Sequence, residues 1–232
     1  MKKLAVIIPA HNEENTIAEV INKVKGVDLE KLGIEKEIIV VDDGSTDSTA
    51  EIIRSKFPFV VLLSNEAKEG KGSAVKKAIA YSDSDFYVIQ DADLEYDPKE
   101  YPRLLQPLVE NNAEIVYGSR FLGRGYPSEV LFPNYIGNLL GTFIANALYG
   151  GSLTDLMTGY KVFSRAAIKG ITITRKGFDI CPELTAKLLK KGKRIYEIPI
   201  DYHGRGKKQG KKIKLIDSLF ILVTLCRFRF AD

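Results

Sequence analysis

The stretch EIIVVDDGSTDSTAEIIRSK, residues 37–56, contains the pattern that decides the fold. It begins with the apolar run 37–41, passes through acids, a glycine and hydroxyls, and ends on residues 48–56, where apolar residues recur at three and four spacing. An apolar run bounded by turn residues is typical of a buried strand, and the second spacing is typical of one face of a helix. The stretch therefore predicts a strand, a polar loop and a helix in succession.

The same alternation continues on both sides of this stretch. Apolar runs predict further strands at residues 4–8, 59–63, 86–89 and 114–117. Helical spacing predicts further helices at residues 13–24, 73–81 and 98–110. Strands that alternate with helices form a mostly parallel sheet with helices on both faces, and such sheets bind ligands at the carboxyl ends of the strands. We therefore expect an α/β, Rossmann-like fold with its site at one edge of the sheet.

Unusual polar segments follow four of these strands. They are residues 9–13, 42–45, 91–93 and 118–120. Asp91 and Asp93 place two carboxylates at a strand end, and a turn there can bring both to one divalent cation. The alternative is an acidic loop that caps the next helix, which is the role we expect for Asp97 before Pro98. Similarly, Ser45 or Asp47 would cap a helix, whereas an adjacent carboxylate at 42 or 43 would bond to a base or ribose.

The alternation of predicted strands and helices ends after Arg120. Residues 130–154 contain no charged side chain, but asparagines, glycines and a proline argue against a membrane span. One apolar stripe at helical spacing comprises Ile136, Leu139, Leu140, Phe143, Ile144, Ala147 and Leu148. This pattern predicts an amphipathic helix that either packs in the core, lies on a bilayer or lines an acceptor groove.

The remaining C-terminal sequence predicts a returning strand at 194–200 and a last helix at 213–226. The apolar run of that helix is too short to cross a bilayer, so it either packs on the body, lies on a membrane surface or begins an anchor. Between the two, residues 203–214 carry six lysines and arginines and no acid. This basic loop is either a solvated, flexible segment or a site for phosphate groups, anionic membrane or nucleic acid.

Composition narrows the class of protein. A chain of 232 residues that is 45% hydrophobic and 28% charged is long enough for one sizeable core. Its two cysteines lie far apart in the sequence and outside any Cys/His cluster. We therefore expect neither a structural zinc site nor a disulfide scaffold. The N-terminus meets Pro9 too soon for the core of a signal peptide, so we expect a cytoplasmic protein.

Five segments, IIPAHNEE, VVDDGSTDST, NEAKEGKGSAVKKA, QDADLEYDP and YGSRF, resemble in order and spacing the motifs of family 2 glycosyltransferases with the GT-A fold. The resemblance covers residues 4–121. It implies a nucleotide-sugar pocket in which Asp91 and Asp93 join Mg2+ or Mn2+ to the donor diphosphate. It also implies that the pocket includes Pro9, Ala10, Glu13, Asp42, Asp43, Lys71 and Ala92.

The second half is similar to the dolichyl- and polyprenyl-phosphate mannose or glucose synthases, through residues 154–161, residues 177–179 and the basic loop. This similarity implies a hexosyltransferase of protein glycosylation. It would move glucose or mannose from UDP-glucose or GDP-mannose to a polyprenyl or dolichyl phosphate, at the cytoplasmic face of a membrane. Two positions depart from the pattern. Glu95, a candidate third metal ligand, stands where mannose synthases commonly have glutamine, and the loop of Arg205, a candidate phosphate ligand, lacks the usual serine.

The implied mechanism distinguishes two kinds of acceptor. The metal would neutralise the leaving nucleoside diphosphate while the acceptor attacks the anomeric carbon from the opposite face and inverts it. A lipid phosphate is already ionised, so it needs cations such as Arg120, Arg124 and Arg205 rather than a base. A sugar hydroxyl would need a carboxylate to take its proton. The candidates for that base are Asp155, Asp179 and Glu183.

These observations predict a GT-A domain over residues 1–211 and an amphipathic C-terminal helix over 212–232. Within the domain, residues 1–121 would bind the nucleotide and residues 122–211 the acceptor. The competing hypotheses are a transferase that acts on a sugar hydroxyl and a non-catalytic nucleotide-sugar-binding module, which would be expected to have lost a metal carboxylate. We expect no nucleic-acid partner, because the cations occupy one loop without interleaved aromatic residues.

Overall fold

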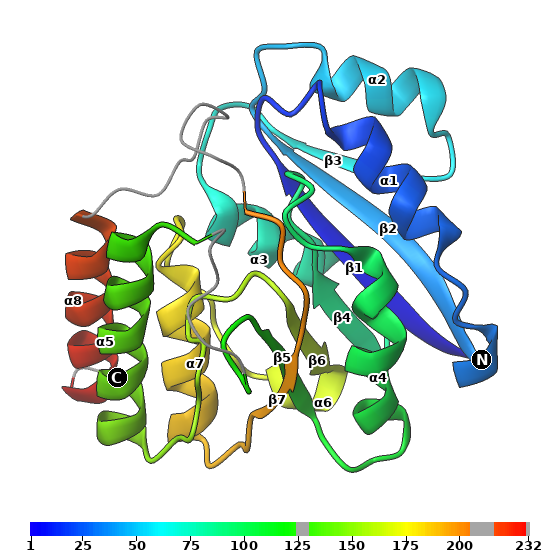
Figure 1. The fold of residues 1–232 in the computed structure, drawn as a ribbon. Helices are drawn as coiled ribbons and strands as arrows, with labels where there is room; N and C mark the ends of the chain where they lie inside the picture. The colour runs from blue at the N-terminus through cyan, green and yellow to red at the C-terminus, as the bar shows by residue number, and fades with distance from the viewer. Residues whose placement is uncertain (124–129, 205–215, 231–232) are drawn as a thin grey trace.

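The computed structural model describes residues 1–123, 130–204 and 216–230. Its strands form one sheet in the order β3-β2-β1-β4-β6-β5-β7 (Figure 1). β6 runs antiparallel to both of its neighbours, and all other pairs are parallel. The strands are β1 (Lys2–Ala10), β2 (Ile34–Asp43), β3 (Val61–Asn65), β4 (Phe86–Ile89), β5 (Ile115–Ser119), β6 (Lys161–Ser164) and β7 (Tyr196–Pro199).

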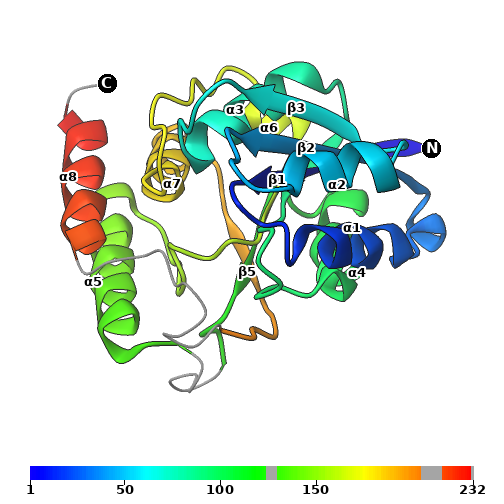
Figure 2. The same cartoon turned by 90° about the horizontal axis from the view of Figure 1, so that it is seen from above.

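Helices cover both faces of this sheet (Figure 2). They are α1 (Ile17–Gly26), α2 (Thr49–Lys56), α3 (Lys71–Tyr81), α4 (Tyr101–Val109), α5 (Phe132–Tyr149), α6 (Arg165–Ile168), α7 (Ile180–Lys190) and α8 (Ile216–Phe230). Two short 3-10 turns, Glu30–Leu32 and Pro98–Glu100, complete the elements. One core lies between the sheet and α1, α2 and α4, and the other lies between the sheet and α3, α6 and α7. The predicted α/β class with helices on both faces is confirmed.

Parallel pairing at the centre of the sheet positions the site. Ala10 at the end of β1 pairs with Asp42 on β2, and Ile7 pairs with Ile89 at the end of β4. The polar segments that follow these strands therefore meet at one edge, as the sequence predicts. Asp97 also caps the Pro98–Glu100 turn as expected, because its side chain accepts a hydrogen bond from the backbone N of Lys99 (3.0 Å).

The sequence analysis missed β6, which inserts between β4 and β5. The strand is only four residues long and begins with a lysine, so it carries no apolar run of the usual kind. Lys161 is nevertheless fully buried, and its ammonium donates to the carbonyls of Leu156 (3.0 Å) and Thr158 (2.6 Å). Hydrogen bonds from a buried ammonium to these two carbonyls help a charged side chain to occupy a core position. β6 begins at the edge where the polar segments meet, because Lys161 pairs with Ile89 at the end of β4.

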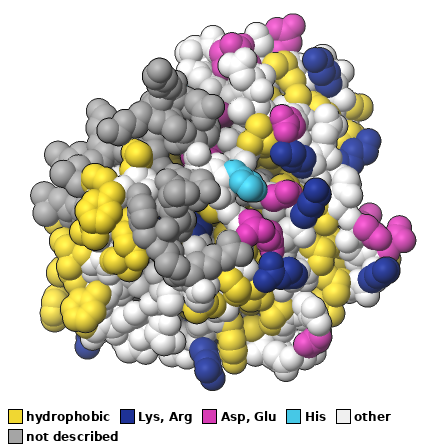
Figure 3. All heavy atoms as spheres, in the orientation of Figure 1, with side chains coloured by type: hydrophobic (Ala, Val, Ile, Leu, Met, Phe, Trp, Pro, Cys, Tyr) yellow, Lys and Arg dark blue, Asp and Glu magenta, His cyan; other side chains and the backbone are white. Residues whose placement is uncertain are grey.

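Most of the apolar stripe of α5 points outward, although Ile144 and Leu148 pack partly buried against a cluster with α7 and α8. The buried residues of this helix are Asn138, Gly141, Thr142 and Ala145. The exposed ones include Phe132, Ile136, Leu139, Leu140 and Phe143. Hydrophobic side chains accordingly gather over α5 and α8 in the space-filling view (Figure 3). We call the exposed apolar residues of α5 the outer apolar face.

The last helix packs on the body. Ile221, Leu225 and Phe228 are buried in a third cluster with residues of α5 and α7, and Tyr149 Oη donates to the carbonyl of Leu225 (2.6 Å). α5 and α8 lie side by side at one end of the molecule in both ribbon views (Figures 1 and 2). Among the described residues, no helix combines the length and the apolar character needed to cross a membrane.

Candidate active site

A cavity of about 350 Å3 lies at the carboxyl ends of the strands. The sheet side of its wall comprises Pro9, Ala10, Glu13, Asp43, Lys71, Asp91, Ala92, Asp93, Glu95 and Arg120. The opposite side comes from α5, the start of α7 and one residue of α8, including Asn134, Asn138, Phe178, Cys181 and Ile221. Acidic and basic side chains gather in the middle of this face of the molecule (Figure 3). The structure thus brings most of the predicted site residues together around one space.

Lys71 and Asp91 form an ion pair in the wall of this cavity. Lys71 is the first residue of α3, and its Nζ donates to Asp91 Oδ1. The two side chains are 10% and 21% exposed. Burial by itself would lower the pKa of Lys71, but the Asp91 carboxylate, together with Cys181 and Asp93, raises that pKa above its ordinary value. A fixed positive charge therefore lies against the first aspartate of the acidic segment.

Gly159 allows the turn before β6 to cross closely over Asp91. A Cβ at this position would collide with Asp91 Oδ2, and it would come within 2.7 Å of the Tyr96 ring. The backbone N of Gly159 donates to Tyr96 Oη (2.8 Å), which fixes the crossing. Only glycine fits such an approach without displacing the carboxylate. The sequence analysis included this glycine in the 154–161 motif but gave it no role.

The acidic segment offers two carboxylates that suit a divalent ion. Asp91 and Asp93 both line the cavity, and carboxylate oxygens are the ligands preferred by Mg2+ and Mn2+. Glu95 also lines it, but its carboxylate accepts a hydrogen bond from Tyr202 Oη (2.5 Å). Within residues 1–123, 130–204 and 216–230, no three or more His, Cys, Asp and Glu side chains gather in a group that could hold a metal ion. Diphosphate and water oxygens would therefore have to complete a site based on the two aspartates.

The two aspartates at the end of β2 have different surroundings. Asp43 lines the cavity, and its carboxylate accepts bonds from Asn65 Nδ2 (2.8 Å) and from the backbone N of Glu69 (2.9 Å) and Gly70 (2.7 Å). It therefore holds the loop that leads to Lys71. Asp42 is absent from the cavity wall, and its Oδ1 accepts from the backbone N of Ser45 (3.2 Å). This separation follows from the alternation of side chains along a strand.

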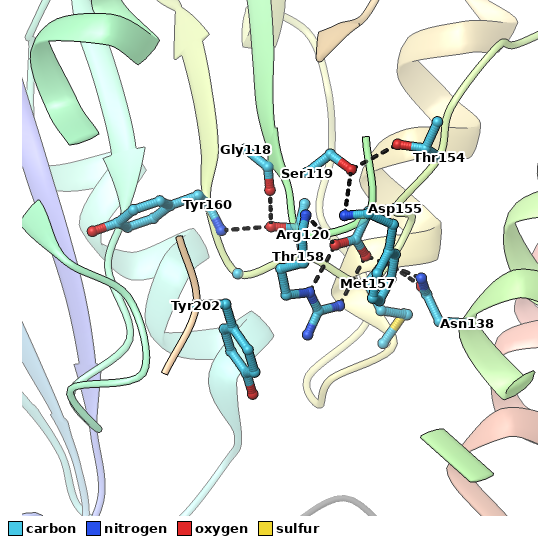
Figure 4. A network of polar contacts seen from close by, with 12 residues as sticks. Gly118, Ser119, Arg120, Asn138, Thr154, Asp155, Met157, Thr158, Tyr160 and Tyr202 are labelled. Atoms are coloured by element: carbon cyan, nitrogen blue, oxygen red, sulfur yellow. Dashed lines mark hydrogen bonds and ion pairs between the residues drawn. The ribbon is translucent and has the colours of Figure 1, made fainter. Parts of the chain in front are cut away.

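Arg120 at the end of β5 is clamped by Asp155. Nε donates to Asp155 Oδ2 (2.7 Å) and Nη2 donates to Oδ1 (2.8 Å), with the backbone N of Arg120 adding a third bond (3.1 Å) (Figure 4). The Arg120 side chain is 11% exposed and that of Asp155 is fully buried. The guanidinium carbon also lies 5.1 Å from the centroid of each of the Phe121 and Tyr202 rings. Arg120 lines the cavity, whereas Asp155 lies behind it and does not.

Glu197 on β7 supports this clamp from further back. Its carboxylate accepts bonds from the backbone N (2.7 Å) and Oγ1 (2.8 Å) of Thr154 and from the backbone N of Asp155 (3.0 Å). Burial raises the pKa of Glu197 above its ordinary value, although these bonds oppose the shift. The sequence analysis did not single out this residue. The sequence signal that could have identified it is an acidic residue within the otherwise apolar run of the strand predicted at 194–200.

The other candidate residues lie away from the cavity or outside the described residues. Glu183 is fully buried, and its carboxylate accepts bonds from Thr174, Arg175 and Lys187. Asp179 stands at the N-cap position of α7, and its carboxylate lies 3.5 Å from Arg175 Nε. The predicted phosphate ligands Arg124 and Arg205 fall outside the described residues.

Comparison with known proteins finds relatives that are named as sugar transferases. A low-salt glycan biosynthesis hexosyltransferase of Haloferax volcanii is 34% identical over 203 residues, which are 87% of this chain and 48% of that protein. A dolichol-phosphate mannosyltransferase of Pyrococcus furiosus is 28% identical over 221 residues, 91% of this chain and 60% of that protein. A UDP-N-acetylglucosamine–dolichyl-phosphate N-acetylglucosaminyltransferase of Methanococcus voltae is 29% identical over 220 residues, 86% and 85% of the two chains. The chain thus spans about half of the first protein and three fifths of the second.

Solved structures show the same fold. Glucosyl-3-phosphoglycerate synthase of Mycobacterium tuberculosis, in complex with Mn2+, uridine diphosphate and phosphoglyceric acid, superimposes with a TM-score of 0.76 at 22% identity. The superposition covers 100% of this chain and 80% of that one, and it confirms the predicted GT-A fold. Residues 5–172 match the model of Glycosyl transferase family 2. Because that match covers well over half of the sequence, the chain belongs to glycosyltransferase family 2.

Proposed function

We propose that this chain is a metal-dependent, inverting hexosyltransferase that moves glucose or mannose from a UDP- or GDP-sugar to a polyprenyl or dolichyl phosphate. One observation carries the proposal: a single cavity is lined both by the carboxylates Asp91 and Asp93 and by the guanidinium of Arg120, which Asp155 clamps. We assign the first group to the donor and the second to the acceptor, and call them the acidic end and the cationic end. An activated sugar with a metal-bound diphosphate suits the first end, and an anionic acceptor suits the second.

At the acidic end, Asp91 and Asp93 would hold Mg2+ or Mn2+, which when bound stabilises the negative charge of the departing nucleoside diphosphate. Lys71 already lies against Asp91, so its ammonium would stand beside the same diphosphate. Asp43 fixes the loop before Lys71 through its bonds to the backbone of Glu69 and Gly70. The three residues Asp43, Lys71 and Asp91 therefore position one another before the donor binds, which is the kind of preorganisation that electrostatic catalysis requires.

At the cationic end, Arg120 keeps donors for a ligand. A guanidinium has five N–H donors, and described residues accept from Nε and from one Nη2 hydrogen of Arg120. The bidentate bond to Asp155 fixes the plane of the group, so the remaining N–H groups have a set direction. A phosphate monoester is ionised at neutral pH and needs such donors rather than a base. We assign Asp155 a positioning role in this arrangement.

The surroundings of the carboxylates disfavour a sugar hydroxyl as acceptor. That reaction needs a carboxylate at the cavity to take a proton. Asp155 and Glu183 are fully buried and saturated with hydrogen bonds, and neither lines the cavity. Asp179 is the remaining candidate, and its carboxylate faces Arg175 instead. A phosphate acceptor is already ionised and needs no such base.

The outer apolar face of α5 supports a membrane-linked acceptor. Phe132 is 61% exposed and Phe143 is 69% exposed, on a helix without a single charged residue. Such a face suits a site beside a lipid surface, where the chain of a polyprenyl phosphate would lie. We therefore place the protein at the cytoplasmic face of a membrane, with the basic loop around Arg205 remaining a predicted contact to phosphate.

A transfer assay tests the function. The protein is incubated with Mn2+, polyprenyl phosphate and one labelled donor at a time, from UDP-glucose, GDP-mannose and UDP-N-acetylglucosamine, and the reaction is extracted with organic solvent. We expect label in the organic phase with UDP-glucose or GDP-mannose, and none when EDTA removes the metal. Label that stays in the aqueous phase with every donor would contradict the proposal, and transfer in EDTA would contradict metal dependence.

A further inference from the structure

A row of polar side chains fastens the inner side of α5 to the segment that holds Arg120. Asn138 Nδ2 donates to Asp155 Oδ1 (3.1 Å), and Asn138 Oδ1 accepts from the backbone N of Met157 (2.9 Å) (Figure 4). One turn later, Thr142 Oγ1 accepts from the backbone N of Leu156 (3.0 Å). After another turn, Asn146 bonds to both the N (2.9 Å) and the O (2.8 Å) of Leu153. We call Asn138, Thr142 and Asn146, which are spaced four residues apart on one helix face, the polar ladder.

Asn134 continues the spacing of the polar ladder by one turn and reaches the cavity. It lines the cavity wall, as Asn138 does. Within residues 1–123, 130–204 and 216–230, Asn134 Nδ2 is the one buried side-chain nitrogen or oxygen that has no hydrogen-bond partner. Folded proteins pair nearly all such atoms, because an unpaired buried donor loses its bonds to water without replacement. The protein therefore satisfies the side chains of the polar ladder, and leaves unpaired the amide nitrogen of Asn134, a residue of the cavity wall.

We propose that Asn134 Nδ2 donates a hydrogen bond to an oxygen of the acceptor phosphate and so helps to determine which acceptor the enzyme takes. This inference rests on the proposed function. Asn134 and Arg120 line the same cavity. Arg120 has N–H groups beyond those that Asp155 accepts, and Asn134 Nδ2 is enclosed and unpaired, so its amide would turn toward the acceptor as it binds. A group that lies between them must present acceptor atoms, and an ionised phosphate oxygen gives the strongest bonds to such donors.

The chemistry of the Asn134 amide explains why this end of the cavity would distinguish a phosphate acceptor from a hydroxyl acceptor. Asn134 is neutral, so it adds a donor without adding a second positive charge beside Arg120. The bidentate bond of that guanidinium to Asp155 already compensates its charge in part. An acceptor with a hydroxyl instead of a phosphate would offer one oxygen to two donors and leave a buried N–H unpaired. The loss of that bond is the usual basis for strong rejection of an analogue that lacks a polar group.

Two variants separate this ligand role from a structural one. Asn134→Leu removes the unpaired amide at nearly constant size, and Asn146→Leu removes an amide of the polar ladder that is bonded on both sides to Leu153. Isothermal titration of each protein with farnesyl phosphate, inorganic phosphate and UDP with Mn2+ gives the affinities, and thermal unfolding gives the midpoint temperature. Farnesyl phosphate serves as a short, soluble polyprenyl phosphate, and inorganic phosphate isolates the head group.

For Asn134→Leu we expect the affinities for farnesyl phosphate and for inorganic phosphate to fall about tenfold, as for the loss of one hydrogen bond to a charged oxygen. Its affinity for UDP with Mn2+ and its unfolding midpoint should stay as in the wild type. For Asn146→Leu we expect the reverse, a lower midpoint with unchanged affinity for farnesyl phosphate.

Three results would overturn the inference. Equal affinity of wild type and Asn134→Leu for farnesyl phosphate would show that water alone pairs the amide, while leaving the proposed function intact. A loss confined to farnesyl phosphate, with unchanged binding of inorganic phosphate, would place the contact on the lipid chain. Failure of the wild-type protein to bind either phosphate would instead refute the proposed acceptor, and with it the inference.

Discussion

The substitution Asp155→Asn tests the clamp on Arg120, because it removes a charge while keeping the size of the side chain. The Arg120 side chain is 11% exposed and that of Asp155 is fully buried, so the guanidinium would stay in the protein without its counter-charge. Breaking a buried ion pair by removing one partner costs about 3–5 kcal/mol. For a domain of this size the loss corresponds to a fall of roughly 6–20 °C in the unfolding midpoint.

The kinetic effect of Asp155→Asn should fall on the acceptor. Without its bidentate partner the guanidinium loses its fixed plane, so we expect a higher KM for polyprenyl phosphate and an unchanged KM for the donor. Unfolding is followed by circular dichroism, because the chain contains no tryptophan. The matched control is Asp83→Asn, which breaks another Asp–Arg pair, to Arg165, whose side chains are 95% and 43% exposed. Surface pairs of this kind contribute little, so the control should unfold like the wild type.

Two results would refute this reasoning. If Asp155→Asn unfolded at the same temperature as Asp83→Asn, the pair would not hold the buried guanidinium in place. If it were destabilised but kept the wild-type KM for polyprenyl phosphate, Arg120 would not contact the acceptor. A change in the KM of the donor alone would contradict the division of the cavity into two ends.

The remaining predictions concern the metal site and the pH dependence of stability. Asp93→Ala should lower kcat on the order of 10²-fold and leave the unfolding midpoint unchanged, and wild-type turnover would show that the metal is misplaced. Gly159→Ala should weaken Mn2+ binding and cost about 1–3 kcal/mol of stability, because the new Cβ would collide with Asp91. Electron paramagnetic resonance measures the Mn2+ affinity, and an unchanged affinity would contradict this prediction. Burial alone would raise the pKa of Glu183, but bonds from Thr174, Lys187 and the backbone outweigh it and lower that pKa. The stability that Glu183 contributes is therefore present above its unfolded pKa and is lost as pH falls through the lower folded value. Glu183→Gln should accordingly flatten the acid side of a plot of unfolding free energy against pH. An unchanged acid side would show that these bonds do not stabilise the ionised carboxylate.

The first half of the fold was predictable because its signals are local. Buried parallel strands read as apolar runs, and the polar segments after them mark the edge where ligands bind. The expected strand at 59–63 lies two residues later in the structure, as β3 (Val61–Asn65), which is an ordinary error at strand ends. The convergence of Pro9, Asp43 and Asp91 on one cavity follows from parallel pairing, and Asp43 then holds the loop before Lys71.

The second half depends on long-range contacts that local patterns do not show. β6 was missed because four residues starting with Lys161 read as polar until the carbonyls that satisfy the ammonium are known. The orientation of α5 differs from ordinary packing because Asn138 and Thr142 find partners in residues 155–157, which keeps the polar side of the helix inside. From hydropathy alone, the apolar face of α5 would be expected to be the buried one. A buried polar face is recognisable only once its hydrogen-bond partners are in place.

The site residues divide in the same way. The acids and cations at strand ends were identifiable by type and position, but their states depend on neighbours from distant elements. Glu197 became visible only through its bonds to Thr154 and Asp155, and the hydrogen bond from Tyr202 to the predicted metal ligand Glu95 was visible only in the structure. Conversely, the structure places Asp42 beside the cavity wall rather than in it, because its side chain points to the other side of β2.

The central claim, that the acceptor is a phosphate held at the Arg120 end of the cavity, is tested most directly by two acceptors that differ in one group. Polyprenyl phosphate and the corresponding polyprenol are offered to the protein with Mn2+ and a labelled donor, and the organic-phase product is identified by mass spectrometry. We expect a single hexose on the phosphate of polyprenyl phosphate and no product from polyprenol. Transfer of the hexose to polyprenol at a comparable rate would contradict it.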